Sequence, residues 1–280
     1  MTGIAENRLI REEDKMKRFA TEKKRAAALL ACILGLTLVA GCASGGSSKE
    51  AAEPVAAEEK ASEPATVEKA PISKEDQKIA TENAKSYDGE MQAVLHSSSG
   101  KEIVLYSPDD NKEAVEKFSA MSNSSPNWIS VESAAASTTL QIDGYSYSVL
   151  NMLDWDTTTC WAEGESRSEG LYENFNYWFF DTTRIDGFRI YPGYQKNQKV
   201  YRNNVYPAGF IVTAGGYSIS CDLGDWPRDL YNDGDNYWID VTFSEPVYDN
   251  SMNVMIIAVG TFGEDPDPDC CITEFHPFYY

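Results

Sequence analysis

Residues 126–280 contain short runs of β-branched and aromatic residues, and this pattern constrains the fold more than any other feature of the chain. The segment holds all six tryptophans, 14 of the 16 tyrosines and 9 of the 11 phenylalanines. Asp-Gly, Pro-Gly and Gly-Gly turn signals separate the runs. The runs are Trp178–Phe180, Gly187–Tyr191, Gly209–Thr213, Tyr217–Ser220, Tyr237–Phe243, Asn253–Val259 and Cys271–His276. Seven or eight strands without a long helix predict one all-β domain, an antiparallel β-sandwich or jelly roll.

The N-terminal region has the organisation of a bacterial export signal. Basic residues precede an apolar stretch from Ala26 to Ala40, which is too short to cross a hydrocarbon core of about 30 Å. Leu38–Cys42 resembles the cleavage box of bacterial lipoproteins, so we expect residues 1–41 to be removed and Cys42 to carry a diacylglycerol. The mature chain would then be lipid-anchored on the extracytoplasmic face of the cell membrane; an uncleaved signal anchor is the alternative. Acidic residues ahead of Met16 are unusual in an export signal, so we expect translation to start there.

Two segments lie between this signal and the β-rich region. Residues 42–85 contain no aromatic residue and are rich in Ala, Glu, Ser, Pro and Lys. Such a composition cannot offset the entropy of ordering, so it predicts a disordered stalk; a partner-binding segment is the alternative. Residues 86–125 are ambiguous. Met91–Leu95 and Glu102–Tyr106 predict a weak hairpin, and a helix is expected to begin near Ser107, so we read this segment as a small connector.

The charge balance restricts the classes of partner. The chain carries 44 acidic and 24 basic residues, and 39 acidic and 16 basic residues follow position 41. A surface this acidic repels nucleic acids and anionic lipids. It favours a cation or a neutral ligand, and solubility alone is the alternative explanation.

Four cysteines follow Cys42, namely Cys160, Cys221, Cys270 and Cys271. An even number in an exported chain favours one or two disulfides, and three pairings are possible. We favour a bridge from one of the two adjacent cysteines to Cys160 or Cys221. None of the spacings is typical of a zinc site.

The sequence offers little support for catalysis. His276 is the one histidine of the β-rich region, and nucleophile-elbow, zinc-protease and phosphate-loop motifs are absent from the sequence. We therefore expect a protein that is not an enzyme, with a hydrolase built on the sandwich as an alternative.

One group of residues resembles the discoidin-like (coagulation factor 5/8 type C) domains. Asn151–Asp156 followed by Thr159–Trp161 is similar to their Asn-Leu-Leu-Asp-Gly-Asp and Thr-x-Trp sequences. Ile185–Ile190 and Ile272–Phe275 are similar to two of their strands. Trp155 stands where the family has glycine, which puts the geometry of this loop in question.

A second group of residues resembles one subgroup of these domains more specifically. Gly193–Lys196 together with Tyr201–Asn204 resembles the subgroup that forms the translocation, or glycan-binding, domain of secreted NAD glycohydrolases. The resemblance runs from Trp128 to the end of the chain. It implies a discoidin-like, galactose-binding-like sandwich over 126–280 and a function in binding rather than hydrolysis.

The resemblance also implies a structural Ca²⁺. Discoidin-like carbohydrate modules often hold this ion between the loop of Asp154, Asp156 and Thr159 and a glutamate of the last strand, here Glu274. Oxygen ligands of this kind suit calcium. Solvated acidic turns are the alternative.

A sugar site needs a flat apolar platform and a few polar groups for hydroxyls. The candidate stacking residues are Tyr145, Tyr147, Tyr194 and Tyr201, and the candidate polar residues are Glu163, Lys196, Arg202, Asn203 and Asn204. Core packing is the alternative for each aromatic residue. The sequence therefore predicts a surface lipoprotein that recognises a host or cell-wall glycan; a protein-interaction module of an envelope complex is the alternative.

Overall fold

The computed structural model describes residues 66–70, 73–108, 110–142, 144–164, 171–223, 235–261 and 268–280. These residues all belong to one compact unit, Lys60–Tyr280. The predicted signal peptide, the predicted lipidation site at Cys42 and most of the predicted stalk lie outside the described residues. In the described part of the chain, no helix is long and apolar enough to cross a membrane.

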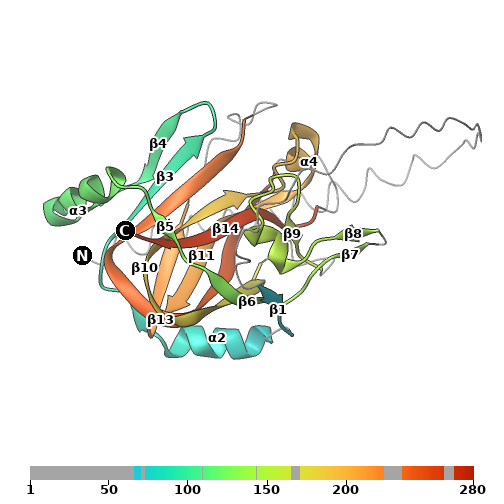
Figure 1. The fold of residues 1–280 in the computed structure, drawn as a ribbon, viewed down its shortest axis with the longest axis horizontal. Helices are drawn as coiled ribbons and strands as arrows, with labels where there is room; N and C mark the ends of the chain where they lie inside the picture. Colours follow the sequence, from blue (N-terminus) through green and yellow to red (C-terminus); the bar gives the residue numbers. More distant parts are fainter. Residues whose placement is uncertain are drawn as a thin grey trace, which may run out of the picture. The chain divides into compact units, whose positions relative to one another are not determined.

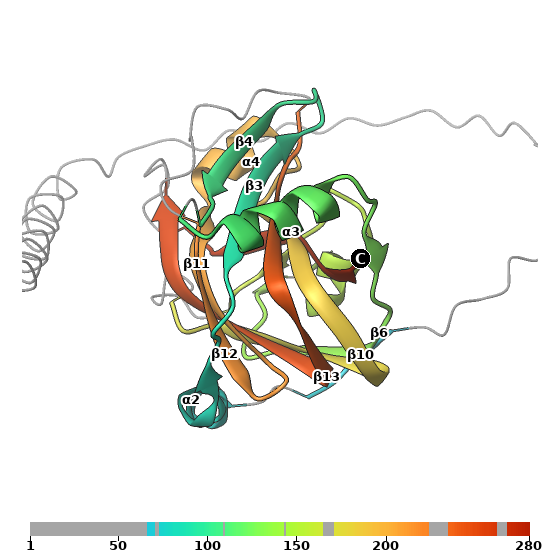
Figure 2. The same cartoon turned by 90° about the vertical axis from the view of Figure 1, so that its left-hand side faces the viewer.

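Two long, bent strands organise the β-sandwich (Figures 1 and 2). β10 (Asn174–Pro192) pairs with β6 (Val131–Ala136) along its first half and with β14 (Cys271–Tyr279) along its second half. β13 (Tyr237–Thr261) likewise pairs first with β3 (Met91–Ser97). Its second half pairs with β11 (Val205–Ala214), which continues to β12 (Tyr217–Asp222). Irregular register between β10 and β13 bends both strands, and each therefore contributes to both layers. The predicted all-β sandwich is confirmed.

Aromatic side chains fill the space between the layers. Phe275 of β14 lies at the centre, with ring centroids 4.9 Å from Phe175 and 4.7 Å from Phe188. Phe210 of β11 contacts the same ring at 6.3 Å, and all four rings are completely buried. This contact between strands distant in sequence explains why the aromatic residues concentrate in the β-rich region.

The shorter elements lie at the ends and edges of the sandwich. β5 (Asn127–Trp128) and β9 (Trp161–Ala162) both pair with β14. β7 (Gln141–Ile142) and β8 (Tyr145–Ser146) form a separate hairpin. The 3₁₀ helix η1 (Val149–Leu153) precedes β9, and α4 (Gln198–Asn203) precedes β11.

Residues 66–85, which we expected in the stalk, carry regular structure. β1 (Val67–Glu68) pairs with β6, and β2 (Lys85–Ser86) pairs with β12. Between them lies α2 (Lys74–Asn83), at the end of the sandwich opposite β4 in Figures 1 and 2. Polar contacts hold this helix: Gln77 Nε2 donates to Asn176 Oδ1 at 2.9 Å, and Lys74 pairs with the buried Glu173. Because polar contacts hold this helix, its sequence has no apolar stripe from which a packed helix could be predicted. Composition alone therefore predicted disorder.

Residues 86–125 belong to the sandwich rather than to a connector. The predicted hairpin is confirmed as β3 and β4 (Glu102–Tyr106), and β3 extends the main sheet through β13. α3 (Lys112–Ser122) begins later than expected, with Asn111 as its N-cap. Within α3, Glu113 and Lys117 form an ion pair at 3.7 Å.

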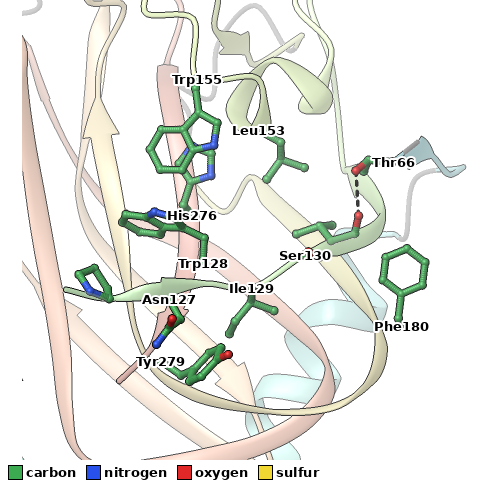
Figure 3. Close-up of a pocket in the computed structure, with 12 residues that line it drawn as sticks. Thr66, Asn127, Trp128, Ile129, Ser130, Leu153, Trp155, Phe180, His276 and Tyr279 are labelled. Carbon is green, nitrogen blue, oxygen red and sulfur yellow. Dashed lines mark hydrogen bonds between the residues drawn. The ribbon is translucent and has the colours of Figure 1, made fainter. Parts of the chain in front are cut away.

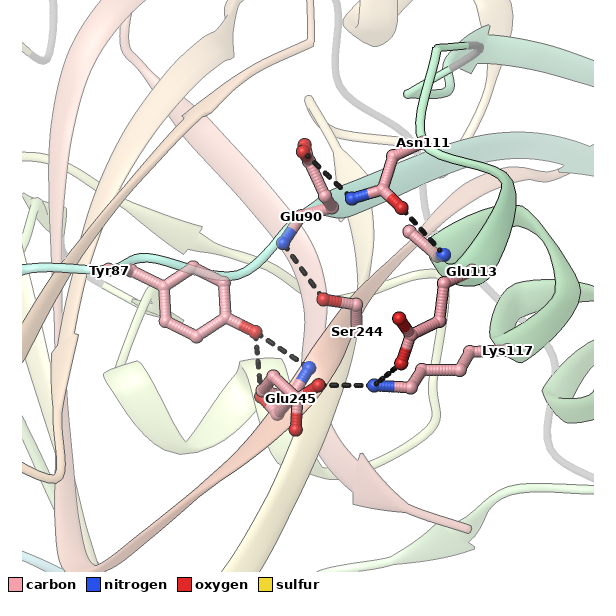
Figure 4. Close-up of polar contacts among 8 residues, drawn as sticks. Tyr87, Glu90, Asn111, Glu113, Lys117, Ser244 and Glu245 are labelled. Atoms are coloured by element: carbon pink, nitrogen blue, oxygen red, sulfur yellow. Dashed lines mark hydrogen bonds and ion pairs between the residues drawn. The ribbon is translucent and has the colours of Figure 1, made fainter.

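Polar contacts fix this segment to β13 (Figure 4). Tyr87 Oη donates to the Glu245 carbonyl at 2.7 Å and accepts from the Glu245 N–H at 2.9 Å. Lys117 of α3 also pairs with the carboxylate of Glu245. The backbone N–H of Glu90 donates to Ser244 Oγ at 2.8 Å. Partners far apart in the sequence make these bonds, so the sequence alone did not reveal them.

Candidate functional site

Two exposed tryptophans, Trp128 and Trp155, pack around the buried His276, and the two indole planes are inclined at 66° to each other (Figure 3). The rings of Trp155 and His276 are stacked, with centroids 3.5 Å apart and planes 2° apart. Trp128 meets Trp155 edge-on at 4.9 Å. Trp155 is 48% exposed and Trp128 is 38% exposed, so both indoles are available to a ligand. We call Trp128, Trp155 and His276 the tryptophan platform.

The tryptophan platform lies in a pocket of about 670 Å³. Phe180 and Tyr279 extend its apolar surface, and Asn127, Ser130 and Thr66 bring polar groups to its wall (Figure 3). A concave site with aromatic faces and a few polar groups can bind a ligand that has both apolar C–H faces and hydroxyls.

The loop between η1 and β9 places Trp155 in an uncommon conformation. Its φ angle is +59°, in the left-handed region that side chains other than glycine rarely adopt. Asp154 shapes the loop: its Oδ1 accepts from the N–H of Asp156 at 2.8 Å, and its Oδ2 accepts from Thr159 Oγ1 at 2.9 Å. The loop thus has a backbone conformation that suits glycine, although the residue is tryptophan. The tryptophan ring in turn stacks on His276.

An ion pair supports Trp128 from the other side. The guanidinium carbon of Arg189 lies 4.9 Å from the centroid of the Trp128 ring and 5.0 Å from that of Trp238. Arg189 donates Nε to Asp240 Oδ1 at 2.7 Å and Nη2 to Oδ2 at 2.8 Å. This bidentate pair fixes the plane of the guanidinium and therefore the indole that packs on it.

Below the two indoles, the titratable side chains of Glu274 and His276 are uncharged at neutral pH. Burial, with a further contribution from the negative charge of Asp154, raises the pKa of Glu274 to about 9. Burial, assisted by the positive charge of Arg189, lowers the pKa of His276 to about 3. His276 Nε2 and Glu274 Oε2 are 2.8 Å apart, which fits a protonated carboxyl donating to a neutral imidazole. The two indoles therefore lie above a pair of side chains without net charge, Glu274 and His276.

The structure brings only some of the predicted calcium ligands together. Asp154 bonds to Thr159 and lies against Glu274, as the effect of its charge on the Glu274 carboxyl indicates. Asp156 Oδ1 accepts from the Thr158 N–H at 2.9 Å and from its hydroxyl at 2.7 Å, which lowers the pKa of Asp156. Over the described ranges, no three or more His, Cys, Asp or Glu side chains are grouped so that they could hold a metal. The donor set is nevertheless composed of hard oxygen ligands, which are the type that calcium prefers.

Part of the predicted sugar site also assembles, on the other side of the same loop. Tyr147 and Tyr194 pack on a small cluster that includes Cys160 and Cys271. Tyr194 Oη donates to the Thr158 carbonyl at 2.9 Å. The exposed Lys196 acts on the Asp156 carboxylate by its charge. Tyr145, on β8, is 69% exposed.

Other predicted sugar-binding residues occupy structural positions. Tyr201 and Glu163 are each 2% exposed, so the roles we expected for them in ligand contact are wrong for this structure. The Tyr201 ring stacks on Tyr206 and fills the space beside Gly193, whose φ is +76°. Within the motif that carried the resemblance, Gly193 and Tyr201 therefore pack against each other.

The remaining predicted residues belong to α4 and the position after it. Arg202 and Asn203 are half-buried on α4. Asn204 Nδ2 donates to the Val200 carbonyl at 2.7 Å and so closes the end of the helix. Sequence reasoning missed the tryptophan platform, although Trp155 in place of the family glycine was the signal that could have indicated it.

The solved structures similar to this chain include carbohydrate-binding modules of low sequence identity. A structure of the CBM32-1 and CBM32-2 domains from Clostridium perfringens ZmpB shares 10% identity with a TM-score of 0.37; the match covers 54% of this chain and about a third (34%) of that chain. The family 32 CBM from C. perfringens NanJ, in complex with galactose, shares 16% identity with a TM-score of 0.36, over 52% of this chain and 92% of that chain. A module named CpGH89CBM32-5, from the same organism, in complex with GalNAc-β-1,3-galactose, shares 13% identity with a TM-score of 0.37, over 52% and 94%.

Among curated proteins, no sequence matches this chain. One family model matches residues 127–276, which is more than half of the chain and includes Trp128, Trp155 and His276. The model is described as the NAD glycohydrolase translocation F5/8 type C domain, in agreement with the resemblance of the Gly193–Lys196 and Tyr201–Asn204 motifs. The chain therefore belongs to the family of the NAD glycohydrolase translocation F5/8 type C domain.

Proposed function

We propose that the chain is a non-catalytic carbohydrate-binding protein and that the tryptophan platform is its sugar site. The observation that carries this proposal is the pair of exposed indoles, Trp128 and Trp155, fixed edge to face in a pocket with polar walls. A pyranose has a flat C–H face that stacks on an indole, and its hydroxyls reach polar groups such as Asn127 and Ser130.

A glycan array probed with the full chain tests the proposal. Trp155→Gly is the key variant because it removes the indole while leaving a residue that favours the observed backbone angle. Tyr248→Ala is the matched control, since Tyr248 is 56% exposed and does not line the pocket. Selective binding that Trp155→Gly loses and Tyr248→Ala keeps supports the sugar site.

The array also separates the platform from the site we expected on the other side of the loop. Asn203→Ala/Asn204→Ala removes polar groups from α4 and leaves the tryptophan platform in place. If the double variant loses glycan binding and Trp155→Gly keeps it, the sugar site lies near Tyr194 rather than at the tryptophan platform. A folded chain that binds no glycan, with or without calcium, favours the protein-interaction module instead.

Calcium binding is a second part of the proposal. Asp154, Asp156, Thr159 and Glu274 are proposed to hold one Ca²⁺, whose charge would stabilise the loop that carries Trp155. The proximity of the Asp154 and Glu274 carboxyl groups supports this, because a cation between them would offset the repulsion that, in addition to burial, raises the pKa of Glu274. Thermal unfolding with calcium or a chelator tests it: we expect calcium to raise the Tm of the wild type and not of Glu274→Gln. An equal Tm in both conditions contradicts it.

The proposed place of action is the outer face of a bacterial membrane. Lipid on Cys42 would anchor the chain, and residues 43–65 would separate the binding domain from the membrane. Metabolic labelling with radioactive palmitate tests this: label in the wild type and none in Cys42→Ser supports the anchor. Equal labelling of both forms, or of neither, contradicts it.

A further inference from the structure

Two cysteine side chains contact each other in a small cluster separate from the main core. Cys160 directly precedes β9, and Cys271 opens β14, the strand with which β9 pairs. With Ala162 they form a buried cluster, in which Cys160 is 1% and Cys271 is 2% exposed. Both side chains are thiols in the structure.

The other two cysteines point elsewhere. Cys270 lies in the main core, although it is adjacent to Cys271, because successive side chains of an extended chain project to opposite sides. Cys221 of β12 is also in the main core, with its Sγ 3.5 Å from Met91 Sδ. The fold thus singles out one of the pairings that the sequence left open.

We propose that Cys160 and Cys271 are a dithiol pair that oxidises to a disulfide and ties the Trp155 loop to β14. Each thiol loses one proton, and one S–S bond forms between the two sulfur atoms. The two electrons pass to an oxidant of the disulfide class, such as a thiol–disulfide oxidoreductase or oxidised glutathione, which is reduced to two thiols. In the cell this rests on the proposed export, because exported chains meet such oxidants; in vitro it does not.

The position of the pair gives the bond a structural role. On one side, the loop of Asp154 and Trp155 ends at Cys160; on the other side, β14 carries Glu274 and His276. The disulfide would close a loop of about 110 residues. A disulfide that closes a long loop reduces the conformational entropy of the unfolded chain more than one that closes a short loop. The hydrogen bond with Cys160, together with burial, raises the pKa of Cys271, so this thiol reacts slowly in the folded chain and we expect the bond to form during folding.

The test is peptide mapping of the full chain after refolding with oxidised and reduced glutathione. Free thiols are alkylated in denaturant, and the chain is cut with trypsin. Residues 229–280 contain no lysine or arginine, so Cys270 and Cys271 fall in the same peptide, whereas Cys160 falls in another. Cys270→Ala and Cys271→Ala therefore assign the partner. We expect the cross-link to Cys160 in the wild type and in Cys270→Ala, and its loss in Cys271→Ala.

A stability measurement complements the map. The oxidised chain is expected to melt about 5 °C or more above the reduced chain, and Cys160→Ala/Cys271→Ala should abolish this difference. Cys221→Ala is the control and should keep both the cross-link and the Tm difference. Alkylation of Cys160 in the oxidised wild type overturns the proposal, as does a cross-link that survives in Cys271→Ala. If the chain forms the disulfide but binds no glycan, the disulfide proposal is supported and only the proposed sugar site is contradicted.

Discussion

The indole of Trp155 lies face to face with the imidazole of His276, although 120 positions separate them in the sequence. This stack holds an exposed aromatic face at the mouth of a pocket, on a loop whose backbone suits glycine. A strained residue that is held by a contact of this kind is typical of a functional site.

Replacing Trp155 should reverse the usual order of alanine and glycine variants. At φ +59° alanine keeps the backbone strain and glycine removes it, so we expect Trp155→Gly to be about 1 kcal/mol more stable than Trp155→Ala. Denaturant unfolding of both variants measures this. Trp128→Ala and Trp128→Gly are the control pair, since Trp128 is in a strand, and there alanine should be the more stable. An alanine variant at 155 that equals or exceeds the glycine variant contradicts the strain.

Removing one oxygen partner of Arg189 should loosen Trp128. Asp240 is 15% exposed and accepts two bonds from Arg189, so Asp240→Asn leaves a largely buried guanidinium with an incomplete partner. We expect the free energy of unfolding to fall by roughly 1–3 kcal/mol and glycan affinity to fall with it. Urea unfolding and a binding titration provide the two readouts.

Glu82→Gln is the control for the loss of a carboxylate. Its pair with Lys78 is 4.0 Å long and exposed, so this change should alter the unfolding free energy by no more than about 0.5 kcal/mol. Equal effects of the two substitutions would show that the Arg189–Asp240 pair has no special role.

Gly193 should tolerate no side chain because of Tyr201. A Cβ at Gly193 would lie 2.6 Å from the Tyr201 ring, whereas one at Gly216 meets nothing within 4 Å. Both glycines have similar positive φ angles, +76° and +74°. Gly216→Ala therefore measures the backbone strain alone, about 1 kcal/mol. Gly193→Ala should cost at least about 1 kcal/mol more in the same unfolding assay; equal costs would contradict the packing role of Tyr201.

The sequence predicted the sandwich well and its strand boundaries less well. Trp178–Phe180 and Gly187–Tyr191 were expected to be two strands, and both belong to β10. The polar residues between them include a register shift, so a bend in a continuous strand has the same local pattern as a turn. Periodicity within a short window cannot distinguish the two cases.

The site was predictable only where its residues are close in sequence. Asp154, Asp156 and Thr159 fall within one loop, and their mutual bonds follow from local spacing. The stack of Trp155 on His276 depends on how β14 passes below the loop, which is a property of the tertiary fold. For Tyr201 the sequence predicted a ligand contact that the fold does not provide. Its polar neighbours suggested an exposed position, but the ring is buried in the core.

The most direct test of the account is to measure, on a glycan array in calcium and in chelator, binding of the full chain and of Trp155→Gly at matched folding. We predict selective binding by the wild type that is lost, or weakened by roughly tenfold or more, in the variant, since one stacking contact contributes about 1–2 kcal/mol. Equal binding by the two proteins, or none by a folded wild type, would contradict a sugar site at the tryptophan platform.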